Sequence, residues 1–375
     1  MSKHFDYTAL AQRFSTRFPV FSYVSIQVNF WVIANLLLGV ILHLQALSIS
    51  HAFNLSGPTS FTPFIMVAII LGVLYGIILG STDYILDKRI FRKKPLGRII
   101  LLKTVISLSI LILLFVLIRF ILFDLLISSS PYGTVFTVTN KSWEYVFIIL
   151  MIYYFFMTLV VNFINQVNKK YGPGVLLPLL LGKYRNPQEE ERIFMFLDLK
   201  SSTSIAEVLG HLNYSSFIRD SFMDINQLLR QYNAAVYQYV GDEIVVTWVV
   251  NDGLKNFACI RFFFACEKQF LARKQYYIMQ YGFLPHFKAG LHMGKVTAVE
   301  IGEIKRDIAY HGDTLNTAAR MQSLCNEYKK KFLVSNYFFE ISKMNEHFKT
   351  ENMGMITLKG KKMSVGILSV EGFAD

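Results

Sequence analysis

Hydrophobic side chains are concentrated in the first half of the chain, where they form four long runs with few charges. Each run is close to the roughly 20 residues that an α-helix needs to cross the hydrocarbon core of a bilayer. The pattern predicts transmembrane helices at about 24–47, 64–82, 99–122 and 145–164. We therefore expect an α-helical membrane domain over residues 1–167, surrounded by lipid.

The pattern changes after this domain, from long apolar runs to short ones separated by polar turns. Residues 168–191 contain Gly-Pro-Gly, Asn-Pro and several charges, and we interpret them as a linker. Residues 192–375 alternate strand-length apolar runs with longer amphipathic stretches, which is typical of a domain with both α-helices and β-strands. The expected order is a strand ending at Asp198, helices 203–210 and 214–232, a hairpin over 237–248, a helix over 254–276, strands 287–291 and 296–301, a helix over 315–329, a strand over 332–335, a helix over 337–344, and strands near 355–358 and 365–370.

Composition and charge indicate how the chain is oriented. The 375 residues are 53% hydrophobic and carry a net charge of +12. Many basic residues lie between the second and third spans: Lys88, Arg89, Arg92, Lys93, Lys94 and Arg98. By the positive-inside rule, this loop, both termini and the second half of the chain are expected in the cytoplasm. Because the basic residues flank apolar spans, membrane topology explains them more simply than nucleic-acid binding does. We therefore expect no nucleic-acid partner.

The remaining composition indicates the compartment. The three cysteines have no paired spacing typical of metal sites, which favours free thiols in a reducing compartment. The first twenty residues are polar and mixed in charge, so no cleavable signal peptide is predicted. Together with the spans, these features predict a multi-pass protein of the cell (inner) membrane.

Small and polar residues inside the predicted spans allow more than one interpretation. Gly72, Gly76 and Gly80 recur every four residues and so share one helical face, which another helix can approach closely. That helix can belong to a second chain or to the same one. His43 and Arg119 fall toward the outer side, where they can sense a ligand or ion or form interhelical hydrogen bonds.

The stretch Phe-Met-Phe-Leu-Asp-Leu-Lys-Ser-Ser-Thr at 194–203 has the features of a strand that ends in a ligand-binding turn. Asp198 lies at the strand exit, and Ser201, Ser202 and Thr203 open a helix whose free N–H groups can bind phosphate oxygens. Farther along, Gly241-Asp242 forms the turn of the predicted hairpin and offers a second carboxylate. Two carboxylates beside a helix amino terminus suit Mg²⁺ or Mn²⁺ bound with a nucleoside triphosphate.

A second informative stretch, at 306–321, contains Asn316 and Arg320 four residues apart, on one face of a predicted helix. An amide beside a guanidinium can orient a ribose and stabilise charge that develops on a phosphorus atom.

Several of these stretches together resemble the catalytic domain of class III nucleotidyl cyclases. The resemblance rests on FLDLKSST around Asp198, YVGDE around Asp242, KAGLHMGKV at 288–296, HGDTLNTAARM at 311–321 and LKGKK at 358–362. It extends over roughly 192–372 and does not include the membrane half. It implies a ferredoxin-like α+β core that acts as a head-to-tail homodimer, with active sites at the interface. Because each such site needs residues from both chains, we also expect the four-helix region to hold two chains together.

The resemblance also implies roles for individual residues. Asp198, the backbone of Leu199 and Asp242 would bind two Mg²⁺ or Mn²⁺ ions per site. Asn316 and Arg320 would act from the other chain, and Lys359, or alternatively Lys361, would contact the triphosphate. The implied reaction is conversion of a nucleoside triphosphate to a 3′,5′-cyclic monophosphate and pyrophosphate.

The two positions that select the base depart from the family pattern. Members specific for adenylate carry a lysine where this chain has Gln238, and an aspartate or threonine where it has Ala309; a guanylate-type Glu and Cys pair is absent as well. Gln238 can donate and accept hydrogen bonds, whereas Ala309 has no polar side-chain group. We expect ATP as the substrate, with GTP, CTP and UTP as alternatives.

Two other functions compete with this interpretation. Diguanylate cyclases also place a Gly-Asp or Gly-Glu turn on a hairpin, but Val240-Gly-Asp-Glu-Ile244 lacks their double glycine. A membrane sensor that binds a nucleotide without turnover would explain the departures at Gln238 and Ala309. It would not need the full set of Asp198, Asp242, Asn316 and Arg320.

Overall fold

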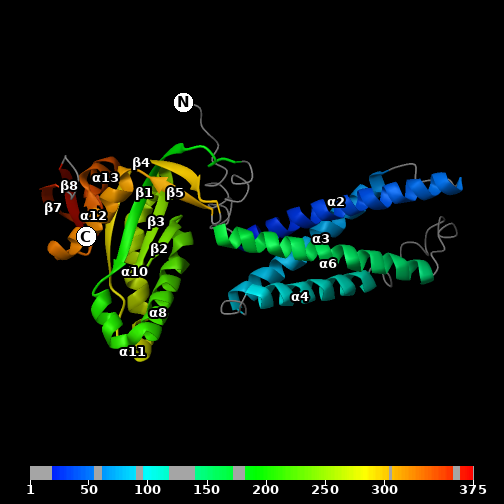
Figure 1. Cartoon of the computed structure of the whole chain (residues 1–375), viewed down its shortest axis with the longest axis horizontal. Coiled ribbons are helices and arrows are strands. Elements are labelled where there is room, and N and C mark those ends of the chain that lie inside the picture. The colour runs from blue at the N-terminus through cyan, green and yellow to red at the C-terminus, as the bar shows by residue number, and fades with distance from the viewer. Residues whose placement is uncertain are drawn as a thin grey trace. The chain divides into compact units, whose positions relative to one another are not determined.

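The computed structural model describes residues 19–54, 61–89, 96–117, 140–171, 182–303, 306–357 and 364–374. The chain divides after Leu176 into two compact units. One consists of long helices, and the other is built around a β-sheet (Figure 1). The division falls inside the predicted linker.

Within the described residues, the first unit contains four helices that are long and apolar enough to cross a membrane. They are α2 (Pro19–Phe53), α3 (Thr62–Arg89), α4 (Leu96–Leu117) and α6 (Asn140–Tyr171). These confirm the four predicted apolar helices. Most of them extend beyond the apolar runs because helical backbone continues into the polar flanking sequence. The predicted end of the third span, including Arg119, lies outside the described residues.

The glycine face of α3 packs against α2 of the same chain. A Cβ atom added at Gly76 would lie 2.5 Å from the Cα atom of Val28, and one added at Gly72 would lie 2.6 Å from the Cα atom of Val32. Gly80 approaches Val24 in the same way, at 2.6 Å. Of the two interpretations of this glycine pattern, the structure therefore supports packing within one chain.

Several polar groups inside the helical unit are paired with one another. Lys103 Nζ of α4 lies 2.9 Å from Asp83 Oδ1 of α3, and Gln27 Nε2 of α2 donates to Asp83 Oδ2 at 2.6 Å. Asn35 is 3% exposed and accepts a hydrogen bond from the Tyr154 hydroxyl at 2.6 Å. Since unpaired polar groups are costly in hydrocarbon, these contacts fix helices α2, α3, α4 and α6 to one another.

The second unit is built on a βαββαβ core, as the resemblance implied. The core consists of β1 (Gln188–Leu199), α8 (Ser202–Leu229), β2 (Ala235–Val240), β3 (Glu243–Val249), α10 (Ala258–Ala272) and β4 (Phe287–Ile301). Its sheet has the ferredoxin-like order β2-β3-β1-β4, continued by β6, β8 and β7, and β5 pairs with β4. β1 lies in the middle of this core, antiparallel to both β3 and β4.

The remaining elements complete the sheet and its helical cover (Figure 1). They are α9 (Val250–Leu254), α11 (Lys274–Tyr281), β5 (Asp307–His311), α12 (Asp313–Glu327), β6 (Phe332–Ser335), α13 (Asn336–Ser342), β7 (Phe348–Ile356) and β8 (Val365–Phe373). Short 3₁₀ turns lie at Arg230–Tyr232, Lys255–Phe257 and Met344–Glu346.

Several expected element boundaries were wrong. The strands expected at 287–291 and 296–301 are one strand, because β1 pairs without a break with β4 from Phe287 to Ala298. The helix expected at 254–276 is interrupted, since Asn256 and Phe257 adopt positive φ angles of 52° and 55°. The linker ends before 191, because residues from Gln188 onward already pair with β4. Strand β5 was not expected.

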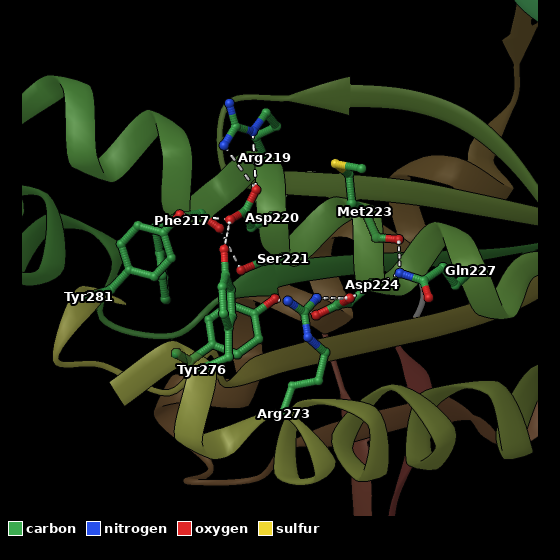
Figure 2. A network of polar contacts seen from close by, with 11 residues as sticks. Phe217, Arg219, Asp220, Ser221, Met223, Asp224, Gln227, Arg273, Tyr276 and Tyr281 are labelled. Carbon is green, nitrogen blue, oxygen red and sulfur yellow. Dashed lines mark hydrogen bonds and ion pairs between the residues drawn. The ribbon is translucent and has the colours of Figure 1, made fainter. Parts of the chain in front are cut away.

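Two aspartates of α8 hold the α11 segment against the core (Figure 2). Asp224 is fully buried; it forms an ion pair with Arg273 and accepts a hydrogen bond from the Tyr277 hydroxyl at 2.6 Å. One turn earlier, Asp220 accepts a hydrogen bond from the Tyr276 hydroxyl at 2.5 Å. These contacts fix the helical layer on one face of the sheet.

Candidate active site

The two candidate metal aspartates lie at the same end of neighbouring strands. Asp198 is the penultimate residue of β1 and pairs with Glu243, the first residue of β3. Asp242 precedes Glu243 in the turn between β2 and β3, where Gly241 has a φ angle of 59° that favours glycine. The antiparallel pairing therefore brings the hairpin turn to the exit of β1.

Among the described residues, two side chains contact Asp198, both at the same oxygen. Lys288 Nζ of β4 lies 3.0 Å from Asp198 Oδ2, and Gln322 Nε2 of α12 donates to Oδ2 at 2.9 Å. Burial raises the pKa of Asp198 above its ordinary value; Lys288 opposes this shift, and the Asp242 carboxylate adds to it. The Asp198 side chain is still 22% exposed, so a ligand can reach it.

Glu243 and Tyr214 add to the negative and polar character of the site. Burial, together with the carboxylates of Asp198 and Asp242, raises the pKa of Glu243 to about 7. Burial and the charge of Asp242 also raise the pKa of the Tyr214 hydroxyl, which interacts with Ser202. Mutual repulsion among these carboxyl groups favours the binding of a cation.

The turn after β1 places the start of α8 beside Asp198. Ser201 precedes the helix with a left-handed φ angle of 60°, and α8 begins at Ser202 and continues through Thr203. Leu199 is buried, and the N–H of Lys200 donates to the carbonyl oxygen of His286 at 2.8 Å. The backbone N–H groups of the first helical turn have no partner within the helix, as expected for an anion-binding end.

Asn316 and Arg320 lie on α12, which packs directly on β4. Asn316 is exposed and Arg320 is half-buried. A Cβ atom at Gly290 of β4 would lie 2.4 Å from the carbonyl oxygen of Ala318, so only glycine permits this close approach. Within the described residues, neither Asn316 nor Arg320 forms a hydrogen bond or ion pair with Asp198 or Asp242 of its own chain.

The two candidate base-selecting residues lie on β2 and β5. Gln238 is exposed and follows a register shift in β2, whereas Ala309 is 7% exposed. Their neighbours meet, because the N–H of Tyr310 donates to the Tyr237 hydroxyl at 3.1 Å. Hence β2 and β5 are close together, although β3, β1 and β4 separate them in the sheet order.

Lys359 and Lys361 lie outside the described residues, as does Arg119 of the membrane half. His43 is described, and its ring lies 4.8 Å from that of Phe61, measured between centroids.

Four residues of the site were not singled out from the sequence: Lys288, Gln322, Glu243 and Tyr214. The sequence could have indicated Glu243, because it directly follows Asp242 at the start of a predicted strand. The other three belong to β4, α12 and the second part of α8, which approach Asp198 only after folding.

The donor set suits a divalent cation bound together with phosphate. Among the described residues, no group of three or more His, Cys, Asp or Glu side chains is arranged to hold a metal by itself. Mg²⁺ commonly takes one or two carboxylates and completes its shell with phosphate oxygens and water. Asp198, Asp242 and the adjoining backbone provide such a partial set beside a helix amino terminus.

Comparison with known proteins identifies the family of this unit. Residues 185–369 match the family described as the adenylate and guanylate cyclase catalytic domain. The second unit belongs to this class III cyclase family. Adenylate cyclase 2 of Rhizobium meliloti (strain 1021) is 35% identical over 208 residues, which are 56% of this chain and 57% of that protein.

Two further similarities are to other cyclases. Adenylate cyclase 1 of the same organism is 23% identical over 189 residues, which are 49% of this chain and 28% of that protein. The crystal structure of the adenylyl cyclase CyaB from P. aeruginosa covers 50% of this chain and 96% of that chain, with 19% identity and a TM-score of 0.43. This chain thus spans less than two thirds of the length of both curated relatives.

Proposed function

We propose that the protein is a membrane-bound nucleotidyl cyclase that converts ATP to 3′,5′-cyclic AMP and pyrophosphate. The observation that carries this proposal is the placement of Asp198 and Asp242 at one end of adjacent strands, beside the amino terminus of α8. The family of residues 185–369 supports the reaction class. Similarity to a protein named adenylate cyclase 2 supports ATP.

In the proposed reaction, the ribose 3′-oxygen attacks the α-phosphorus and pyrophosphate leaves. Asp198, the Leu199 backbone and Asp242 would hold two Mg²⁺ or Mn²⁺ ions, which would neutralise phosphate charge and favour ionisation of the 3′-hydroxyl. N–H groups at the start of α8, from Ser202 and Thr203, would bind phosphate oxygens.

Asn316 would orient the ribose by hydrogen bonding, and Arg320 would stabilise charge on the transferring phosphorus. We assign these two residues to the partner chain of a homodimer. The proposal is supported by the absence, among the described residues, of contacts from Asn316 or Arg320 to the aspartates of the same chain. Lys359 remains a proposed triphosphate contact.

The substrate is tested with full-length protein in detergent and Mn²⁺ or Mg²⁺, with ATP, GTP, CTP and UTP offered separately and products identified by mass spectrometry. We expect cyclic AMP from ATP, and no product from a folded Asp198→Ala variant. A cyclic dinucleotide would instead indicate a diguanylate cyclase.

The shared site is tested by mixing two inactive chains. An Asp198→Ala/Asp242→Ala chain paired with an Asn316→Ala/Arg320→Ala chain retains one complete site per mixed dimer. Activity should return in the mixed dimer and stay absent in either homodimer. An inactive mixed dimer, with both chains folded and pairing shown by tag capture, would contradict the shared site.

A second candidate function is nucleotide sensing without turnover. It is favoured by the base-selecting positions, because Gln238 is exposed and Ala309 is buried without a polar side-chain group. Nucleotide binding without product, under the conditions above, would select this candidate.

We further propose that the four apolar helices span the inner membrane, with the amino terminus and the cyclase domain in the cytoplasm. In this arrangement, helix contacts between two chains would add to pairing through the cyclase domains. The basic residues between the second and third helices support the orientation.

A further inference from the structure

The side chain of Gln322 joins two parts of the cyclase domain that the proposed function assigns to different active sites. Gln322 lies on α12, the helix that carries Asn316 and Arg320. Its side chain is almost completely buried, with 5% of the residue exposed. Its Nε2 atom donates to Asp198 Oδ2 at 2.9 Å. One helix therefore contacts a metal aspartate of its own chain and presents two residues to the partner.

The position of this amide is set by the contact between α12 and β4. A Cβ atom at Gly290 would lie only 2.3 Å from the backbone nitrogen of Gln322. Near the start of the helix, the Thr314 hydroxyl donates to the carbonyl oxygen of Lys295 at 2.8 Å. Near its end, Cys325 Sγ lies 3.3 Å from the carbonyl oxygen of Ala289. Because both ends are anchored, the Gln322 amide is held in a fixed position beside the Asp198 carboxylate.

Gln322 and Lys288 share one oxygen of Asp198 but differ in charge. Lys288 neutralises the carboxylate, so a divalent cation competes with it for Asp198. The Gln322 amide is neutral and can keep Oδ2 in place while a cation binds. Neither a hydrogen bond nor an ion pair from the described residues reaches Asp198 Oδ1, which is thereby left for the ligand.

We propose that Gln322 is a positioning residue for the metal site. Its amide holds Asp198 to α12, so that the helix which gives Asn316 and Arg320 to one active site also orients a metal carboxylate of the other. The inference rests on the proposed function, in which two chains share each site. It assigns to Gln322 an effect on metal binding rather than on the chemical step.

Mn²⁺ binding to the full-length protein, measured by electron paramagnetic resonance without nucleotide, tests the contact directly. Gln322→Met keeps a similar volume and removes the amide; Gln322→Asn keeps an amide that is too short to reach Asp198. Both should weaken Mn²⁺ binding roughly tenfold, the loss typical of a partner that orients a metal ligand. Ser323→Ala, on the exposed side of the same helix, should leave binding unchanged. Unchanged binding in folded Gln322→Asn would overturn the inference.

Mixed dimers show through which chain Gln322 acts. When Gln322→Met is placed in the chain that supplies the working Asp198, the Mn²⁺ concentration for half-maximal activity should rise roughly tenfold. Activity at saturating Mn²⁺ should change little. When the same substitution is placed in the chain that lacks Asp198, this Mn²⁺ concentration should change less than about twofold, because the carboxylate that Gln322 would contact is already absent. Equal effects from both chains would overturn the inference. If the mixed dimer is inactive even with native Gln322 in both chains, the shared site is contradicted instead. Mn²⁺ binding to the homodimers would then still test the contact between Gln322 and Asp198.

Discussion

The carboxyl group of Glu243 is partly buried beside two other carboxyl groups, and its pKa is raised to about 7. Burial is the main cause, and the charges of Asp198 and Asp242 add to it. A carboxyl group with a pKa of about 7 is half-protonated at neutral pH. Cation binding would favour its ionised form and release a proton.

The shift predicts that Glu243 makes stability depend on pH in the metal-free protein. Its pKa is about 7 in the folded state and 4.5 in the reference state, so unfolding releases a proton between these values. The free energy of unfolding should therefore fall as the pH rises through this window, by about 1 kcal/mol, since the group is partly exposed to solvent. Glu243→Gln should remove this slope.

The measurement is urea-dependent hydrogen–deuterium exchange of β1 and β3 peptides with EDTA present, comparing the two proteins at the same pH. Native protein should lose stability relative to Glu243→Gln between pH 5 and pH 7. If the difference in stability between the two proteins is constant from pH 5 to pH 7, Glu243 does not titrate in this range.

At the scale of elements, glycines set the distance between packed surfaces in both units. Gly290 brings α12 onto β4, and Gly72, Gly76 and Gly80 bring α3 onto α2. In each place the atoms nearest to an added Cβ include backbone atoms, which cannot rotate away as a side chain can. A single methyl group should therefore move a whole helix.

Gly290→Ala should lower cyclase activity by displacing α12, which carries Asn316, Arg320 and Gln322. We expect a destabilisation of about 1–3 kcal/mol, typical of overpacking, and a loss of kcat at saturating Mn²⁺. The matched control is Gly372→Ala in β8, where an added Cβ has no atom within 4 Å. Assays at several Mn²⁺ concentrations with thermal unfolding measure both effects. Native activity in Gly290→Ala would show that α12 tolerates the shift.

Gly76→Ala should weaken the pairing of α2 and α3, because its Cβ would lie 2.5 Å from the Val28 Cα atom. A lower unfolding temperature of the protein in detergent is expected. Gly97→Ala in α4 has no atom within 4 Å of the added Cβ and serves as the control. It should leave the unfolding temperature unchanged or raise it, since alanine favours helix over glycine by about 1 kcal/mol. An equal effect of both changes would argue against close packing at Gly76.

At the scale of the whole molecule, a unit of apolar helices and a cyclase domain occur in one chain. The proposed orientation places the basic segment around Arg98 in the cytoplasm and the segment around Glu144 outside. Arg98 and Glu144 are both exposed. The three native cysteines are buried, so they should contribute little background to thiol labelling of the folded protein.

Variants with one added cysteine each test this orientation, through labelling of intact cells with a membrane-impermeant maleimide. Glu144→Cys should be labelled in intact cells. Arg98→Cys should be labelled only after the membrane is opened. The reverse pattern would invert the proposed topology and place the cyclase domain outside.

The sequence alone determined the four apolar helices and the cyclase fold. Long apolar runs and the order of strands and helices are local properties, because they depend on residues close together in the chain. The motifs around Asp198, Asp242 and Asn316 were also local, and they indicated the family before any contact was known. The spans and the βαββαβ order were therefore predicted, whereas the break in the helix at 256–257, the single strand over 287–301 and strand β5 were not.

Only the tertiary structure decided which side chains meet. It joined 287–301 into one strand, because pairing with β1 continues unbroken through the residues between the two expected strands. It assigned the glycine face of α3 to α2 of the same chain, and it brought Lys288 and Gln322 to Asp198. These contacts join residues between 40 and 124 positions apart. Sequence spacing carries no signal at such separations, since the meeting of the elements depends on how the whole sheet and its helices pack.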